Sequence, residues 1–133
     1  MDKAAREAFV AKPNTAVIAT VDAKGRAHAV PVWYLWKDRA FWIITARDSA
    51  KHRHILNTGR ASLCIDQREG GTKSVTAEGP VAIGDTVTKE FRLALHTHYV
   101  GAEEAHRRVD TSTAHEGMVM LTLAPERWLD YGG

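Results

Sequence analysis

Cysteine is almost absent from this chain: Cys64 is the only one, so no disulfide can form within the chain. A lone thiol is typical of proteins that work in reducing compartments, and we expect a cytoplasmic protein. The first residues, MDKAAREAF, are charged and lack the apolar core of a signal peptide. No apolar run approaches the roughly 20 residues that a membrane helix requires, so we expect no membrane partner.

Neither sign of charge is in large excess. The 18 lysines and arginines nearly balance the 16 aspartates and glutamates, which gives a formal net charge of +2. Nucleic-acid-binding proteins usually carry a basic stripe, and we therefore expect no nucleic-acid partner. The chain has 133 residues, of which 44% are hydrophobic, and this is enough for one core. We expect a single domain over residues 1–133.

β-branched and aromatic residues fill the middle of the chain, with turn residues between them. We predict strands at 15–22, 27–36, 40–46, 61–67, 73–85 and 117–124, and helices at 2–11, 49–59 and 86–101. The first three strands are expected to form a meander, and the strand at 73–85 is expected to break at Gly79-Pro80. Cys64 is interpreted as a small buried residue of its strand. These elements predict a mainly β (α+β) fold, an antiparallel barrel of about six strands with inserted helices.

The segment HAVPVWYLW, residues 28–36, places Trp33, Tyr34 and Trp36 on one predicted strand together with Pro31. Proline has no backbone N–H, so Pro31 interrupts the hydrogen-bond ladder of that strand. This combination favours a strand that contacts a flat, partly apolar ligand.

The segment TARDSAKHRHI, residues 45–55, carries cations where a helix begins, with Asp48 or Ser49 as the expected N-cap. The first turn of a helix normally favours acidic residues, because its free N–H groups carry partial positive charge. Cations here, Lys51 among them, indicate an anion between them, and a phosphate fits that role. The alternative is a solvated basic face whose long side chains cover apolar surface.

The seven histidines do not predict a metal site. The pairs His52/His54 and His96/His98 lie on predicted helices, where residues two apart point about 200° away from each other and cannot share an ion. His52 and His54 are interpreted as solvated or phosphate-adjacent. No acid–base pair stands out, so no catalytic residue is assigned.

Taken in order, the segments HAVPVWYLW, FWIITARDSAKHRHI (41–55), ASLCID (61–66) and VTAEGPVAI (75–83) resemble the flavin-binding split-barrel superfamily. This is the family of pyridoxamine 5'-phosphate oxidase-like proteins and deazaflavin-dependent reductases. The resemblance implies an antiparallel six-stranded split β-barrel and a homodimer that holds its cofactor in the groove between subunits. The cofactor-binding residues that it implies are Val30, Pro31, Val32, Trp33, Thr45, Arg47, Ser49 and Lys51.

Within that set, the strand residues Val30, Pro31 and Val32 match the positions that lie along the cofactor ring. Thr45, Ser49 and Lys51 match the phosphate-binding positions, with Arg47 as a further candidate. Trp33, together with Arg92 and Trp128, could wall the site from across the dimer.

This sequence departs from the pyridoxamine 5'-phosphate oxidases at several positions. Ala50 stands where those enzymes pair an arginine with the phosphate lysine, and PERWLDYGG lacks their terminal arginine-leucine-histidine segment. The chain is more similar to the short deazaflavin-dependent reductases. The expected cofactor is therefore coenzyme F-420, with FMN as the alternative.

Three functions from different classes follow. The first is an oxidoreductase that uses coenzyme F-420, or FMN, to transfer hydride to a small unsaturated or quinone-like substrate. The second is a flavin-, haem- or tetrapyrrole-binding protein without turnover. The third is a structural dimer without a cofactor.

Overall fold

The structure is a computed structural model and describes residues 1–132. Its strands are β1 Ala16–Val21, β2 Ala27–Val32, β3 Leu35–Lys37, β4 Ala40–Ala46, β5 Arg60–Gln67, β6 Lys73–Gly84, β7 Met118–Leu123 and β8 Arg127–Tyr131. Its helices are α1 Lys3–Val10, α2 Ala50–Thr58, α3 Lys89–Val100 and α4 Ala102–Val109, with a 3₁₀ turn, η1, at Ala114–Gly117.

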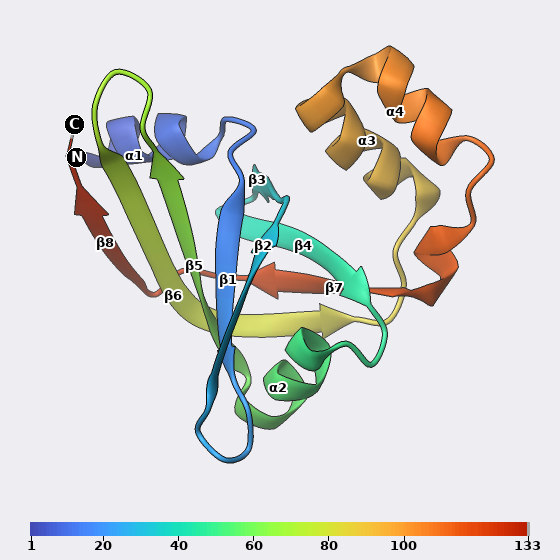
Figure 1. Cartoon of the computed structure of the whole chain (residues 1–133), viewed down its shortest axis with the longest axis horizontal. Coiled ribbons are helices and arrows are strands. Elements are labelled where there is room, and N and C mark those ends of the chain that lie inside the picture. The colour runs from blue at the N-terminus through green and yellow to red at the C-terminus, as the bar shows by residue number, and fades with distance from the viewer. Residues whose placement is uncertain (133) are drawn as a thin grey trace.

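The strands form one antiparallel sheet that curls into a split barrel (Figure 1). Their order is β2-β1-β5-β6-β7-β4-β3, and β8 pairs with β6. The predicted mainly β fold class is confirmed, but the predicted number of six strands is wrong. β8 was not predicted, because its partner lies about 50 residues earlier in the chain and no local hairpin signal marks it.

The strand predicted at 27–36 is in fact two strands. β2 pairs with β1 and β3 pairs with β4, so these strands do not form one meander. The chain turns between them at Trp33 and Tyr34. The Tyr34 N–H donates to the Tyr99 hydroxyl at 3.1 Å instead of to a neighbouring strand. That bond and the complete burial of Tyr34 end the first ladder.

The predicted break at Gly79-Pro80 is also wrong, because β6 runs through it. Here β6 leaves β8 and begins to pair with β7 (Figure 1). A Cβ atom on Gly79 would lie 2.1 Å from the Ala124 carbonyl oxygen, so only glycine permits this close approach. Gly79-Pro80 therefore marks the crossing from one half of the barrel to the other.

The core lies between the two halves of the sheet and is filled by alternate residues of each strand. On β5, Ala61, Leu63 and Ile65 are buried. Cys64 therefore faces outward and is exposed, which corrects its predicted burial. On β4, Phe41 is fully buried beside the half-buried Trp42.

The helices begin and end at residues suited to those positions. Ser49 caps α2, and Gly59 ends it with φ 73°. The helix predicted from residue 86 begins at Lys89 with Thr88 as its cap. α3 and α4 form a hairpin beside the barrel, while α1 and α2 lie at other edges (Figure 1). No described helix is both long and apolar enough to cross a membrane.

Candidate functional site

The turn from β4 into α2 brings two predicted residues together. The Thr45 and Ser49 hydroxyl oxygens lie 3.0 Å apart and share a hydrogen bond. Ser49 Oγ also accepts the backbone N–H of His52 at 3.3 Å. Thr45 is buried and Ser49 half-buried, so the two hydroxyls form a sheltered polar corner at the start of α2.

The backbone of this corner adopts an uncommon conformation at Asp48, whose φ is 65°. Side chains of α2 hold it there. The Asp48 N–H donates to His52 Nδ1 at 3.0 Å, and Arg53 Nη1 donates to the Asp48 carbonyl oxygen at 2.5 Å. His52 is buried, which excludes the solvated setting among the two that were predicted for it, solvated or phosphate-adjacent. Strained turns held by several side chains are common at functional sites.

Lys51 lies in the first turn of α2, which contains no acidic residue. It forms no ion pair with any residue from 1 to 132. Partial burial lowers the pKa of its ammonium group from the ordinary 10.5. A half-buried lysine without a carboxylate, in the first turn of the helix that the Ser49 hydroxyl caps, is suited to hold an oxyanion.

Arg47, the fourth residue predicted in this segment, points elsewhere. Its Nη2 donates to the Asp85 carbonyl oxygen at 2.8 Å, and its Nη1 lies 3.6 Å from Asp85 Oδ1. This residue ties the β4–α2 turn to the segment after β6. Its charge already has a partner.

The predicted ring-binding residues lie on β2, at one end of the sheet. Val30 and Val32 turn inward against the core, whereas Pro31 is exposed on the outer face. Within the described chain, β2 pairs only with β1, so its second edge is free. Backbone N–H and C=O groups on a free edge are available to a ligand.

Three residues outside the eight predicted cofactor-binding positions connect the two halves of the site. The His28 ring of β2 meets the His54 ring of α2 edge-on, with centroids 5.5 Å apart. His54 Nδ1 is hydrogen-bonded to Thr20 Oγ1 of β1 at 2.9 Å. Lys51 lies three residues before His54 on α2, and Val30 two residues after His28 on β2. By helix periodicity Lys51 lies on the same face of α2 as His54, and by strand periodicity Val30 lies on the same face of β2 as His28. The start of α2 and the predicted ring-binding strand β2 therefore lie on one side of the barrel.

The remaining predicted wall residues have partners within their own chain. Trp33 stacks on Tyr99 of α3 at 4.4 Å. Arg92 is buried and donates to Ser112 Oγ at 3.0 Å. Trp128 lies under the Arg6 guanidinium, on the far side of the fold near α1.

The sequence also matches a protein-family model. The model for pyridoxamine 5'-phosphate oxidase matches residues 1–132. The chain belongs to this family. Among curated proteins, none matches the chain at a significant level.

Solved structures agree with this assignment at the level of the fold. A conserved hypothetical protein from Mycobacterium tuberculosis superposes with a TM-score of 0.84 at 21% identity, covering 98% of this chain and 84% of the other. An F-420 reductase gives 0.74 at 16% identity, over 92% and 94%. The haem storage protein of Vibrio cholerae gives 0.69 at 14% identity, over 97% and 92%. The pyridoxamine 5'-phosphate oxidase fold of this chain is thus similar to that of proteins with different ligands.

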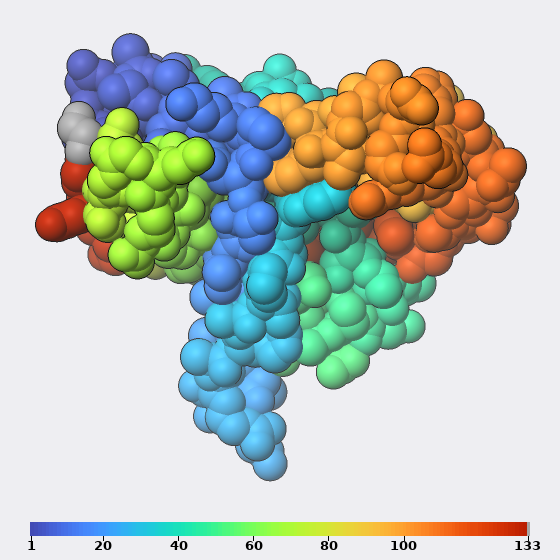
Figure 2. Space-filling model, turned by 45° about the horizontal axis from the view of Figure 1, so that its top comes forward, coloured from blue at the N-terminus to red at the C-terminus, as the bar shows by residue number. Residues whose placement is uncertain are grey.

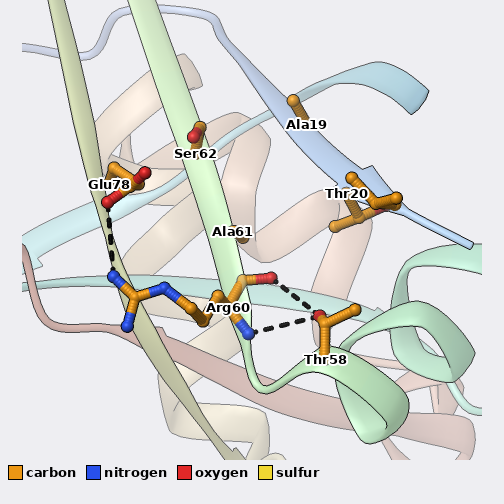
Figure 3. A pocket seen from close by; sticks show the side chains of 8 residues that line it. Ala19, Thr20, Thr58, Arg60, Ala61, Ser62 and Glu78 are labelled. Atoms are coloured by element: carbon orange, nitrogen blue, oxygen red, sulfur yellow. Dashed lines mark hydrogen bonds and ion pairs between the residues drawn. The ribbon is translucent and has the colours of Figure 1, made fainter. Parts of the chain in front are cut away.

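A separate cavity of about 220 Å³ lies on the outer face of this pyridoxamine 5'-phosphate oxidase barrel, between β1 and β5 (Figure 3). None of the eight predicted residues lines it. Its one cation, Arg60, donates to Glu78 at 3.2 Å and to Glu126 at 2.6 Å, so its charge is compensated. This cavity has no uncompensated cation to bind a phosphate. We therefore place the candidate site at α2 and β2.

Proposed function

We propose that this protein is an oxidoreductase that binds the deazaflavin coenzyme F-420 and passes hydride to a small unsaturated or quinone-like substrate. One observation carries the proposal: Lys51 is half-buried without an acidic partner among residues 1–132, two residues after Ser49, whose hydroxyl shares a hydrogen bond with Thr45. Desolvating a charge is unfavourable unless a counter-charge compensates it. A phosphate or phosphodiester of a cofactor would supply that counter-charge.

The residues of this chain have distinct tasks in the proposal. Lys51 and the two hydroxyls bind the phosphate, and the free edge of β2 at Val30, Pro31 and Val32 flanks the ring. Trp33, held against Tyr99, forms one wall. When bound, the cofactor itself supplies the hydride chemistry, so the protein needs to position the ring and exclude water more than to provide an acid–base pair.

The arrangement of cations favours coenzyme F-420 over FMN. FMN ends at its phosphate and favours a compact cage of cations, but Ala50 leaves the cage thin and Arg47 is paired with Asp85. The longer acidic tail of coenzyme F-420 needs one anchor and further cations outward, such as Arg53. Each exposed pair contributes on the order of 0–1 kcal/mol, so the preference is modest and sensitive to salt.

A second subunit completes the site in this proposal. One row across the outer face of the sheet joins Pro31, Val17, Cys64, Thr76 and Leu129. Val17 is 39% and Leu129 56% exposed, which leaves apolar surface uncovered in the monomer. Strands β1 and β2, which carry part of this row, project from the body as a narrow arm (Figure 2). We assign the row across the sheet face, and not the turn at the tip of the arm, to a homodimer.

A titration of the cofactor-free protein with coenzyme F-420 and FMN, at low and high salt, tests the proposal. We expect tighter binding of coenzyme F-420, with a difference that shrinks as salt screens the tail. Turnover of reduced coenzyme F-420 with a quinone-like acceptor would establish the activity. FMN affinity equal or superior at both salt concentrations would overturn the cofactor choice. Tight haem binding without turnover would favour a non-catalytic binding protein instead.

A further inference from the structure

A second cavity, lined mainly by cations and aromatic rings, lies on the far side of the fold from α2. Its volume is about 80 Å³, and its lining includes Lys3, Arg6 and Glu7 of α1, Arg39 of the β3–β4 turn, Trp36 of β3 and Trp128 of β8. β4 separates Arg39 from the Thr45 corner, and six residues of strand span about 20 Å. The cavity is therefore distinct from the site at α2.

The charges around this cavity are not balanced. Lys3, Arg6 and Arg39 face a single acidic residue, Glu7, and none of the three cations forms an ion pair with residues 1–132. Arg6 Nε is also buried without a hydrogen-bond partner in that part of the chain. A buried donor is rarely left unsatisfied, because it loses its bonds to water and gains nothing in return. Arg6 Nε therefore lacks an acceptor, although Glu7 lies in the same lining.

Aromatic rings fix the position of the Arg6 guanidinium. It lies 4.3 Å above the Trp128 ring, and Trp128 meets Trp36 edge-on with centroids 5.7 Å apart. Stacking on an indole restricts a guanidinium without using its N–H donors. Arg6 is thus held in place with donors still free for a ligand.

The backbone at Arg39 is also unusual. Asp38 and Arg39 have φ values of 51° and 60°, so both residues of this two-residue hairpin turn are left-handed. Asn-Gly is the preferred sequence for such a turn, and an arginine in that conformation is unfavourable. Its presence places a third cation at the cavity, where a glycine would place none.

We propose that this cavity binds a doubly charged oxyanion of the phosphate class. Net lining charge, an unsatisfied guanidinium donor and fixed aromatic walls all favour such a ligand. The volume of about 80 Å³ exceeds the roughly 10–15 Å³ that one water molecule needs, so the cavity has room for a group larger than water. This site does not depend on the proposed cofactor site, because it shares none of its residues.

Inorganic phosphate at constant ionic strength is the probe, and the four tryptophan indole N–H signals in a ¹H–¹⁵N NMR spectrum are the readout. Assignment of each signal by a Trp→Phe variant makes the measurement specific to position. We expect saturable shifts of the Trp36 and Trp128 signals, and no shift at Trp42, whose Nε1 donates to the Lys37 carbonyl oxygen. Chloride added to the same ionic strength should produce no such shift.

Three variants test which cations bind. Arg6→Gln should weaken phosphate binding about tenfold or more, as expected for the loss of a charge-assisted hydrogen bond. Arg39→Asn should also weaken it, and asparagine tolerates the left-handed turn, so this variant keeps the test valid if Arg6→Gln unfolds. Lys24→Gln, in the exposed β1–β2 turn, is the matched control and should bind as the native chain does.

Lys51→Ala separates this proposal from the proposed function. Shifts at Trp36 and Trp128 that persist in Lys51→Ala support an independent site. The proposal is overturned if these signals do not saturate, or if Arg6→Gln and Arg39→Asn shift as the native protein does. Equal weakening in Lys24→Gln would also overturn it, because it would indicate general charge attraction only.

Discussion

The Trp33 indole lies flat on the Tyr99 ring, with centroids 4.4 Å apart and planes 5° apart. The Tyr99 hydroxyl donates to the Asn14 carbonyl oxygen at 2.6 Å and accepts the Tyr34 N–H at 3.1 Å. Burial raises the pKa of Tyr99 to about 12, so this hydroxyl stays protonated at neutral pH. α3 is thereby attached to the corner between β2 and β3, where the chain crosses from one half of the barrel to the other.

Tyr99→Phe should lower the free energy of unfolding by about 1–3 kcal/mol, because it leaves the Tyr34 N–H without its acceptor. The ring stack with Trp33 is retained, so the change isolates the hydroxyl. Chemical denaturation measures the difference, and Tyr131→Phe, at a residue that is 68% exposed, is the control. Equal losses in both variants would mean that the hydroxyl bonds do not anchor α3.

Lys51→Ala should weaken cofactor binding by about 1.5–3 kcal/mol, the range for a hydrogen bond to a charged group. Binding to the native protein should weaken with salt. Burial lowers the pKa of Lys51, so its ammonium group loses its proton earlier as pH rises. Affinity for the cofactor should therefore begin to fall at a lower pH than it would with an ordinary lysine. Isothermal titration against coenzyme F-420 measures all three effects. Unchanged affinity, with Lys24→Ala as reference, would remove α2 from the site.

Light scattering at micromolar concentration should give twice the monomer mass of 14.7 kDa. We expect an interface above roughly 2,000 Å² in total, because the apolar row on the outer sheet face has no cover in the monomer. Leu129→Glu should dissociate the dimer, since a charge would be buried there without a partner. Leu56→Glu, on α2 and similarly exposed, is the matched control. A monomer mass for the native chain would contradict both the dimer and a shared site.

Asp22 in the β1–β2 turn should titrate far below an ordinary aspartate. It accepts the backbone N–H of Arg26 and of Lys24, both at 2.9 Å, and Arg26 Nε at 2.7 Å. The Arg26 backbone bond, followed by the Arg26 side chain, lowers its pKa from 3.8 to about 2. Because the folded-state pKa lies below the unfolded value, this carboxylate stabilises the turn above about pH 3.8, and that stability is lost as pH falls through about 2.

NMR titration of the Asp22 carboxyl carbon measures this midpoint directly. Arg26→Gln removes the side-chain bond and keeps the backbone bonds to Asp22. The Asp22 midpoint in this variant should therefore lie between about 2 and the ordinary 3.8. Hydrogen exchange of the Arg26 amide should be faster in Asp22→Asn than in the native chain at neutral pH. A native midpoint near the ordinary value would show that the turn does not hold the carboxylate.

Local chemistry was enough to predict most elements of the fold from the sequence. β4 was predicted with its observed bounds, and α2 with its terminal Gly59 and a cap at Asp48 or Ser49, of which the structure has Ser49. These features depend on residues within a few positions of one another, such as a hydroxyl that accepts a helix N–H. The contact between Thr45 and Ser49 follows from the same local geometry, since the two residues lie four positions apart at the start of α2.

Tertiary structure decided the features whose partners are distant in the sequence. Cys64 was predicted to be buried, but strand alternation and pairing with β1 and β6 place it outside. The split of residues 27–36 into β2 and β3 depends on Tyr99, 65 residues beyond Tyr34. The pairing of β8 with β6, and the contact of His28 with His54, likewise depend on how the sheet curls. Local periodicity sets which face a side chain occupies, whereas only the packed barrel determines which faces meet.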